Sequence, residues 1–72
     1  MKKMIMEFVR RDTFDRPVYK CDGRYYVDTD PRTDACPAAM FTKSSNNIDG
    51  EPDWPVRDCE FEFVPKRDTW WG

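Results

Sequence analysis

The chain has 72 residues, of which 39% are hydrophobic, 15% aromatic and 36% charged, and its formal net charge is −2. A chain of this length forms one domain around one core, and aromatic side chains must fill much of that core. The slightly acidic balance gives no overall attraction to phosphate backbones, which argues against nucleic acid as the default partner. We therefore expect a single small domain over residues 1–72, in which residues 66–72 are a candidate flexible tail.

Cysteine and histidine usage limits the chemistry. The cysteines Cys21, Cys36 and Cys59 are odd in number and widely spaced, which fits neither a disulfide framework nor paired zinc ligands. The chain has no histidine, so it lacks the commonest zinc ligand and the side chain most often used as a general base near neutral pH. We expect reduced thiols, no bound metal or cofactor, and a protein that is not an enzyme.

The N-terminal segment predicts a first strand over residues 4–9. Alternation places Met4, Met6 and Phe8 on one face and Ile5, Glu7 and Val9 on the other. Glu7 and the arginine pair that follows Val9 keep the apolar run too short for a secretion signal or a membrane span. The protein is therefore expected in the cytoplasm, without membrane contact.

Residues 17–28 predict the hairpin around which the fold is built. Two β-prone runs flank Asp22 and Gly23, a pair typical of a tight type I′ turn. A two-residue loop sets the register, which pairs Val18 with Val27, Tyr19 with Tyr26, Lys20 with Tyr25 and Cys21 with Arg24. Both faces of the hairpin carry apolar side chains, so it needs neighbours on at least one side.

The segments on either side of the hairpin are polar and turn-rich. Before it, Phe14 is the residue expected to reach back into the core. After it, Asp28, Asp30 and Asp34 surround a proline and indicate ordinary turns in preference to a catalytic carboxylate cluster. Residues 35–43 are ambiguous between helix and strand, and strand is favoured over residues 40–43.

Residues 44–55 predict a long loop dense in turn formers, whose two prolines exclude a central strand. Ile48 and Trp54 are the residues expected to hold this loop against the core. Asp49, Glu51 and Asp53 alternate as calcium ligands do, but the spacing departs from an EF-hand, so a solvated acidic turn is the preferred interpretation.

Residues 59–64 show the cleanest alternation in the chain, with Phe61 and Phe63 directed inward and Glu60 and Glu62 directed outward. This pattern is typical of an antiparallel strand with one solvated side. The sequence therefore predicts an all-β or β-rich α+β fold, a strongly twisted or barrel-like antiparallel sheet of four or five strands. The expected core is Met6, Phe8, Val18, Tyr19, Tyr26, Val27, Phe41, Trp54, Phe61 and Phe63.

Several of these segments together carry a resemblance to a group of known proteins. They are residues 14–20, the turn of Asp22, Gly23 and Arg24, and residues 44–47 running into 49–55. In these stretches the chain resembles short uncharacterised proteins of bacterial mobile elements, of the large polyvalent protein-associated domain type. The resemblance implies a bacterial cytoplasm and an accessory role. That group has no agreed activity, so no catalytic residue is carried over.

Two functions follow as hypotheses. The first is a protein-interaction module that binds a protein partner through the loop at 44–55 and exposed tryptophans, because tryptophan is enriched among interface hot spots. Its candidate residues are Asp49, Glu51, Asp53, Trp54, Trp70 and Trp71. The alternative is a nucleic-acid-binding accessory domain that uses Lys20, Arg24 and Tyr25 of the basic, aromatic hairpin. The sequence leaves the oligomeric state open.

Overall fold

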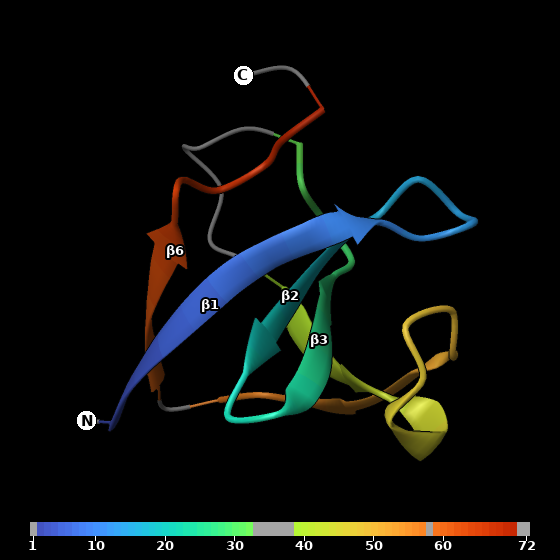
Figure 1. The fold of residues 1–72 in the computed structure, drawn as a ribbon, viewed down its shortest axis with the longest axis horizontal. Coiled ribbons are helices and arrows are strands. Elements are labelled where there is room, and N and C mark those ends of the chain that lie inside the picture. The colour runs from blue at the N-terminus through green and yellow to red at the C-terminus, as the bar shows by residue number, and fades with distance from the viewer. Residues whose placement is uncertain (1, 33–38, 58, 71–72) are drawn as a thin grey trace.

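The computed structural model describes residues 2–32, 39–57 and 59–70, which form one sheet with its connections (Figure 1). The strands are β1 (Lys2–Arg11), β2 (Pro17–Cys21), β3 (Arg24–Asp28), β4 (Met40–Lys43), β5 (Pro52–Pro55) and β6 (Cys59–Val64), and a 3-10 turn, η1, covers Ser44–Asn46. Over these residues no helix is long and apolar enough to cross a bilayer. The β-rich class is confirmed, and β4 and β6 have the predicted bounds.

The sheet is mixed, with the strand order β5-β4-β3-β2-β1-β6. All neighbouring pairs are antiparallel except β1 and β6, which are parallel. The prediction of a four- or five-stranded antiparallel sheet is therefore approximate, because the described residues form six strands and one pair is parallel. Alternation predicts which side chains of β6 face the core, but it does not predict the direction in which that strand pairs.

The sheet is strongly curled, and its curvature follows from one short connection. Residues 56–58 join β5 to β6, which are the two edge strands of the sheet. Three linking residues reach about 14 Å at most, whereas a flat sheet of this width would separate its edges by about 24 Å. The strands therefore wrap around a common interior (Figure 1). The edges β5 and β6 do not pair, so the predicted barrel-like shape is approximate and the sheet stays open.

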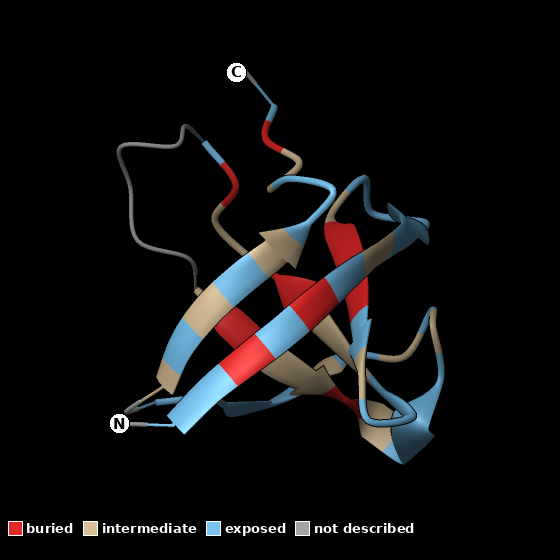
Figure 2. Ribbon diagram, turned by 60° about the vertical axis from the view of Figure 1, so that its left-hand side comes forward, coloured by how far each residue is buried: buried red, intermediate tan, exposed pale blue. Residues whose placement is uncertain are grey.

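The face of the sheet directed to this interior, called the inner face here, carries the apolar core. Met4, Met6, Tyr19 and Met40 are buried there, and seven partly buried side chains pack against them: Phe8, Cys21, Tyr26, Val56, Cys59, Phe61 and Phe63. Burial alternates along β1 as predicted (Figure 2). The Tyr19 ring lies 5.0 Å from that of Phe63 and 5.8 Å from that of Phe8, and burial raises the pKa of its phenol to about 12.

The hairpin of β2 and β3 has the predicted register. Its residues pair as Val18 with Val27, Tyr19 with Tyr26, Lys20 with Tyr25 and Cys21 with Arg24. Asp22 and Gly23 have φ values of 50° and 78°, the left-handed conformation that a type I′ turn requires at both loop positions. The dipeptide therefore determined both the turn and the pairing of the two strands.

Two of the side chains expected to contact the core are exposed. Phe14 is 60% exposed and Trp54 is 70% exposed. Phe14 lies in the turn between β1 and β2, where its ring contacts the Arg16 guanidinium at 4.8 Å in place of the core. Trp54 lies on an edge strand, in which residues 53–55 are all exposed. The predictions failed because hydrophobicity alone does not tell which aromatic residues the sheet can cover.

Cys21 and Cys59 are free thiols, half-buried on the inner face. Burial is the main cause that raises the pKa of the Cys21 thiol, which lowers its reactivity near neutral pH. Three residues named in the predictions, Asp34, Cys36 and Trp71, lie outside the described residues.

Candidate functional site

Trp54 is presented from β5, at one edge of the sheet. Pro52 and Pro55 bound this strand and lack backbone N–H groups, which suits an edge position and explains why the segment cannot be a central strand. The backbone N–H of Trp54 donates to Thr42 Oγ1 at 3.1 Å. The backbone at Trp54 is thus held against β4 while most of the residue stays in contact with solvent.

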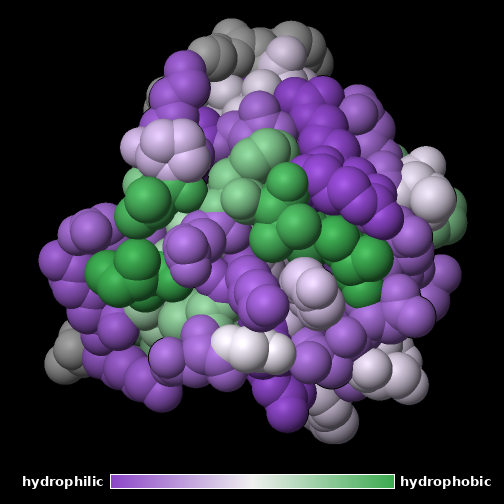
Figure 3. All heavy atoms as spheres, in the orientation of Figure 1, coloured by the Kyte–Doolittle hydropathy of each residue, from purple (hydrophilic) through white to green (hydrophobic). Residues whose placement is uncertain are grey.

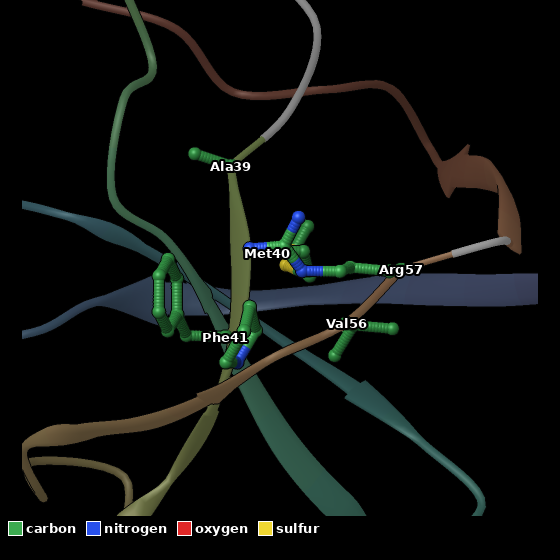
Figure 4. Close-up of a pocket in the computed structure, with 6 residues that line it drawn as sticks. Ala39, Met40, Phe41, Val56 and Arg57 are labelled. Carbon is green, nitrogen blue, oxygen red and sulfur yellow. The ribbon is translucent and has the colours of Figure 1, made fainter.

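A shallow hollow of about 240 Å³ lies beside this strand, between β4 and the connection that follows β5. It is lined by Ala39, Met40, Phe41, Pro55, Val56 and Arg57. Figure 4 shows Arg57 extending toward Met40. The hollow therefore combines apolar contacts with one cation, and it begins at the residue next to Trp54.

The loop that leads into β5 is held at its base by a buried lysine. Lys43 Nζ is fully buried and donates to Asp12 Oδ2 at 2.7 Å and to the carbonyl oxygen of Gly50 at 2.9 Å. Asp12 also accepts hydrogen bonds from the backbone N–H groups of Phe14 and Arg16. Burial alone would raise the pKa of Asp12, but the bonds from Lys43 and these backbone groups hold it below its ordinary value. The charged pair therefore joins the turn after β1 to the loop before β5.

The loop also closes on itself. Ser44 donates its backbone N–H to the carbonyl of Glu51 at 2.9 Å, and Gly50 donates to the carbonyl of Asn47 at 2.9 Å. A Cβ atom at Gly50 would lie 2.5 Å from the Ser44 carbonyl oxygen, so this position requires glycine. The loop at 44–51 is compact for this reason.

Asn46 connects the same loop to the hairpin. Its side-chain Nδ2 donates to the carbonyl of Gly23 at 3.1 Å, and its Oδ1 accepts from the backbone N–H of Tyr25 at 2.8 Å. Asn46 adopts a φ of 51°, a conformation that asparagine tolerates better than most residues. Lys43 at its base and Asn46 at its turn thus fix the loop from two directions.

The acidic residues of this segment have different surroundings. Asp49 Oδ2 lies 3.2 Å from Arg10 Nη2, so its charge is partly compensated by β1. Glu51 and Asp53 are exposed on either side of Pro52. No group of three or more potential metal ligands occurs in the part of the chain that the structure describes. Because Glu51 and Asp53 are exposed and lie within three residues of Trp54, they place negative charge close to it.

Trp70 does not join this surface. Trp70 is 39% exposed, its backbone N–H donates to the Pro31 carbonyl, and its indole Nε1 donates to the Asp15 carbonyl, both at 2.8 Å. The C-terminal segment lies at the top of Figure 1, while β5 runs along the bottom. Trp71 lies outside the described residues. Of the predicted partner-binding residues, the structure gathers Asp49, Glu51, Asp53 and Trp54 on one segment.

The residues of the nucleic-acid hypothesis are divided between the two faces of the hairpin. Lys20 lies opposite Tyr25 and its ammonium is 5.8 Å from the Tyr25 ring, whereas Arg24 lies opposite Cys21 on the other face. Tyr19 of the same hairpin is fully buried. The described hairpin therefore does not present these cations and rings as one surface.

Sequence reasoning missed the buried charged pairs. Besides Asp12 and Lys43, Asp28 is fully buried and its Oδ2 lies 3.0 Å from Arg67 Nη2. The partners are 31 and 39 positions apart in the chain. The available signal was weak: Lys43 follows Phe41 at the strand spacing of two, which places its side chain on the same face.

Comparison of this chain with protein-family models, with curated proteins and with solved structures finds no match.

Proposed function

We propose that this protein is a non-enzymatic interaction module that binds a protein partner through residues 44–55, with Trp54 as the main contact. The observation that carries the proposal is the position of Trp54, which is 70% exposed on an edge strand whose backbone is bonded to Thr42. Core packing does not account for an aromatic residue in this position. An ordered backbone lowers the entropy lost on binding, because less of the surface must be immobilised.

The surroundings of Trp54 indicate the chemistry of the partner. Glu51 and Asp53 add negative charge on one side, and the hollow that begins at Pro55, with its apolar side chains and Arg57, lies on the other. A complementary surface would offer an apolar pocket for the indole and lysine or arginine side chains at its rim. Asp49 contributes less, because Arg10 already compensates its charge.

Trp70 has a different role in this proposal. Its two hydrogen bonds to Pro31 and Asp15 attach the C-terminal segment to the turns around it. In this proposal Trp70 therefore stabilises the fold more than it contributes to binding. Trp71 stays a candidate for binding from the sequence alone. The resemblance to proteins of bacterial mobile elements adds the proposal that the module acts in a bacterial cytoplasm as an accessory factor.

The test is capture of a partner from nuclease-treated bacterial extract, followed by affinity measurements with the purified partner. Trp54→Ala is expected to weaken binding by at least about thirtyfold, as loss of an interface hot spot does. Its melting temperature should move by less than about 3 °C, because the residue covers little of the core.

Phe14→Ala is the matched control, since Phe14 is also an exposed aromatic residue but lies in a different turn. It should leave the affinity unchanged. Equal affinities for wild type, Trp54→Ala and Phe14→Ala would refute the proposal, as would a Trp54→Ala variant that is partly unfolded.

A further inference from the structure

The second edge of the sheet is formed by β6, which differs from β5 in what it offers. Residues Cys59–Val64 pair with Lys2–Glu7 of β1 on one side, in an unbroken parallel register. No strand among the described residues pairs with the other side, and β6 stands at the left edge of the sheet in Figure 1. Every second residue of a strand directs its N–H and C=O to the same side, so half of the backbone groups of β6 point away from β1.

Of the usual protections against a further strand, this edge carries charged side chains but no proline and no bulge. Edge strands are commonly blocked by proline, by a bulge or by being very short. Proline bounds β5 at both ends, and β5 has four residues. β6 has six residues, contains no proline and shows no register shift against β1. Its backbone is therefore available as a template for β-strand addition.

The side chains of β6 specify which strand would fit. On the inner face Phe61 and Phe63 are only partly buried, so an added strand could place apolar side chains beside them. On the outer face Glu60 and Glu62 are exposed. Lys3 on β1 already pairs with Glu62 at 2.9 Å, which shows that a neighbouring strand can place a cation against this row. Glu60 makes no ion pair among the described residues.

Exposed apolar side chains near this edge enlarge the surface. Val64 on β6 is 40% exposed, and Ile5 on β1 is 43% exposed. The face of the molecule on which β1 and β6 lie carries apolar patches between hydrophilic areas (Figure 3). A partner strand would therefore gain apolar contacts as well as backbone hydrogen bonds.

We propose that the free edge of β6 binds an extended strand of another protein in which apolar and basic side chains alternate. Apolar side chains would lie beside Phe61 and Phe63, and lysine or arginine would lie beside Glu60 and Glu62. Charge complementarity favours this occupant over a second copy of the chain, because pairing β6 with β6 would bring two rows of glutamate together. The proposal does not depend on Trp54, which lies on the opposite edge.

The probe is a synthetic peptide of alternating lysine and valine, matched in length to the six residues of β6 and measured by fluorescence anisotropy. It should bind more tightly than a peptide of alternating glutamate and valine, and more tightly than a block peptide with the same three lysines followed by the same three valines. The block peptide has the same charge, so equal binding of the two lysine peptides would indicate non-specific attraction and refute the proposal.

Backbone pairing is tested with two N-methylated versions of the probe, one methylated at the odd residues and one at the even residues. The N–H groups of odd and even residues point to opposite edges of an extended peptide, and only one edge can pair with β6. The version methylated on that edge should lose at least about tenfold in affinity, and the other should bind nearly as well as the parent. Equal affinities of the two versions would contradict strand addition.

Charge selection is tested with the double variant Glu60→Lys and Glu62→Lys. It should bind the lysine–valine peptide about tenfold more weakly and the glutamate–valine peptide correspondingly better. Circular dichroism checks that this variant stays folded. Trp54→Ala is the matched control and should bind the peptide as wild type does, which separates this site from the proposed Trp54 surface. An unchanged preference in the double variant would refute the proposal.

Discussion

The inner face of the sheet and the loop that carries the proposed binding surface are held by different forces. The inner face depends on buried apolar side chains around Tyr19, three of them methionines. The loop at 44–51 depends on polar contacts, which centre on Lys43 and its bonds to Asp12 and Gly50. Damage to the inner face should therefore unfold the protein, whereas damage to the Lys43 contacts should release the loop before the rest of the sheet.

The largest effect is expected at Tyr19. Tyr19→Ala removes a fully buried ring from the centre of the inner face, and such truncations cost about 3–5 kcal/mol. Urea denaturation should show a loss close to the whole stability of a small domain. Tyr19→Phe keeps the ring and loses only the oxygen that accepts the Asp68 N–H, so about 1 kcal/mol is expected. Similar losses in both variants would show that the ring does not fill the core.

The Lys43 contacts come next. Lys43→Met leaves the buried Asp12 with only the Arg16 guanidinium as a cation, 3.2 Å from its Oδ2, and losing one partner of a buried pair in this way costs about 3 kcal/mol. Hydrogen exchange should become faster first at the backbone amides of residues 44–51, because the loop loses its attachment to Asp12. Lys20→Met is the control, since Lys20 is exposed, and it should leave exchange in the loop unchanged. A uniform increase over the whole sheet would contradict the division between the two regions.

Acid should weaken the contact between Asp12 and Lys43 that holds the loop at 44–51. Because the pKa of Asp12 is lower in the folded protein than its ordinary value, its contribution to stability is present above the ordinary aspartate pKa. That contribution is lost as the pH falls through the lowered value. Wild type should therefore lose stability below about pH 4, and Lys43→Met should lose less over the same interval because its Asp12 keeps only the Arg16 guanidinium as a cation. Denaturant titrations between pH 6 and pH 2.5 measure both slopes, and equal slopes would overturn this assignment.

The smallest effects are expected at the tryptophans Trp70 and Trp54. Trp70→Phe removes the indole N–H that donates to the Asp15 carbonyl and should cost about 1 kcal/mol. Within the described residues Trp54 makes a backbone hydrogen bond but none through its indole. Trp54→Phe should therefore leave the melting temperature unchanged. Thermal melts of the two variants give the comparison directly. A larger loss for Trp54→Phe than for Trp70→Phe would place Trp54 in the core.

The sequence predicted what local patterns determine. Asp22 and Gly23 gave the hairpin and its register, and alternation gave the inward positions of β1 and β6. The parallel pairing of β6 with β1 could not be predicted, since it depends on how the chain passes from one edge of the sheet to the other. The exposure of Phe14 and Trp54 was missed for the same reason, because burial depends on neighbours that are distant in sequence.

The structure describes where the candidate residues of 44–55 lie, and their role in binding stays a prediction. Residues 44–55 were identified as a long loop from their turn formers, and the four candidate residues within it lie on one segment. The strand at β5 and the role of Lys43 were not foreseen, because both require partners elsewhere in the sheet. The two terminal tryptophans were grouped with Trp54 by residue type alone, and the structure separates Trp70 from it.

The most direct test of the central claim is acrylamide quenching of Trp54 fluorescence in a Trp70→Phe and Trp71→Phe variant, measured alone and with the captured partner. The exposed indole should be quenched strongly in the free protein and should become shielded in the complex. A Trp54 that is already shielded in the free protein, or that is quenched equally with and without the partner, would contradict the account.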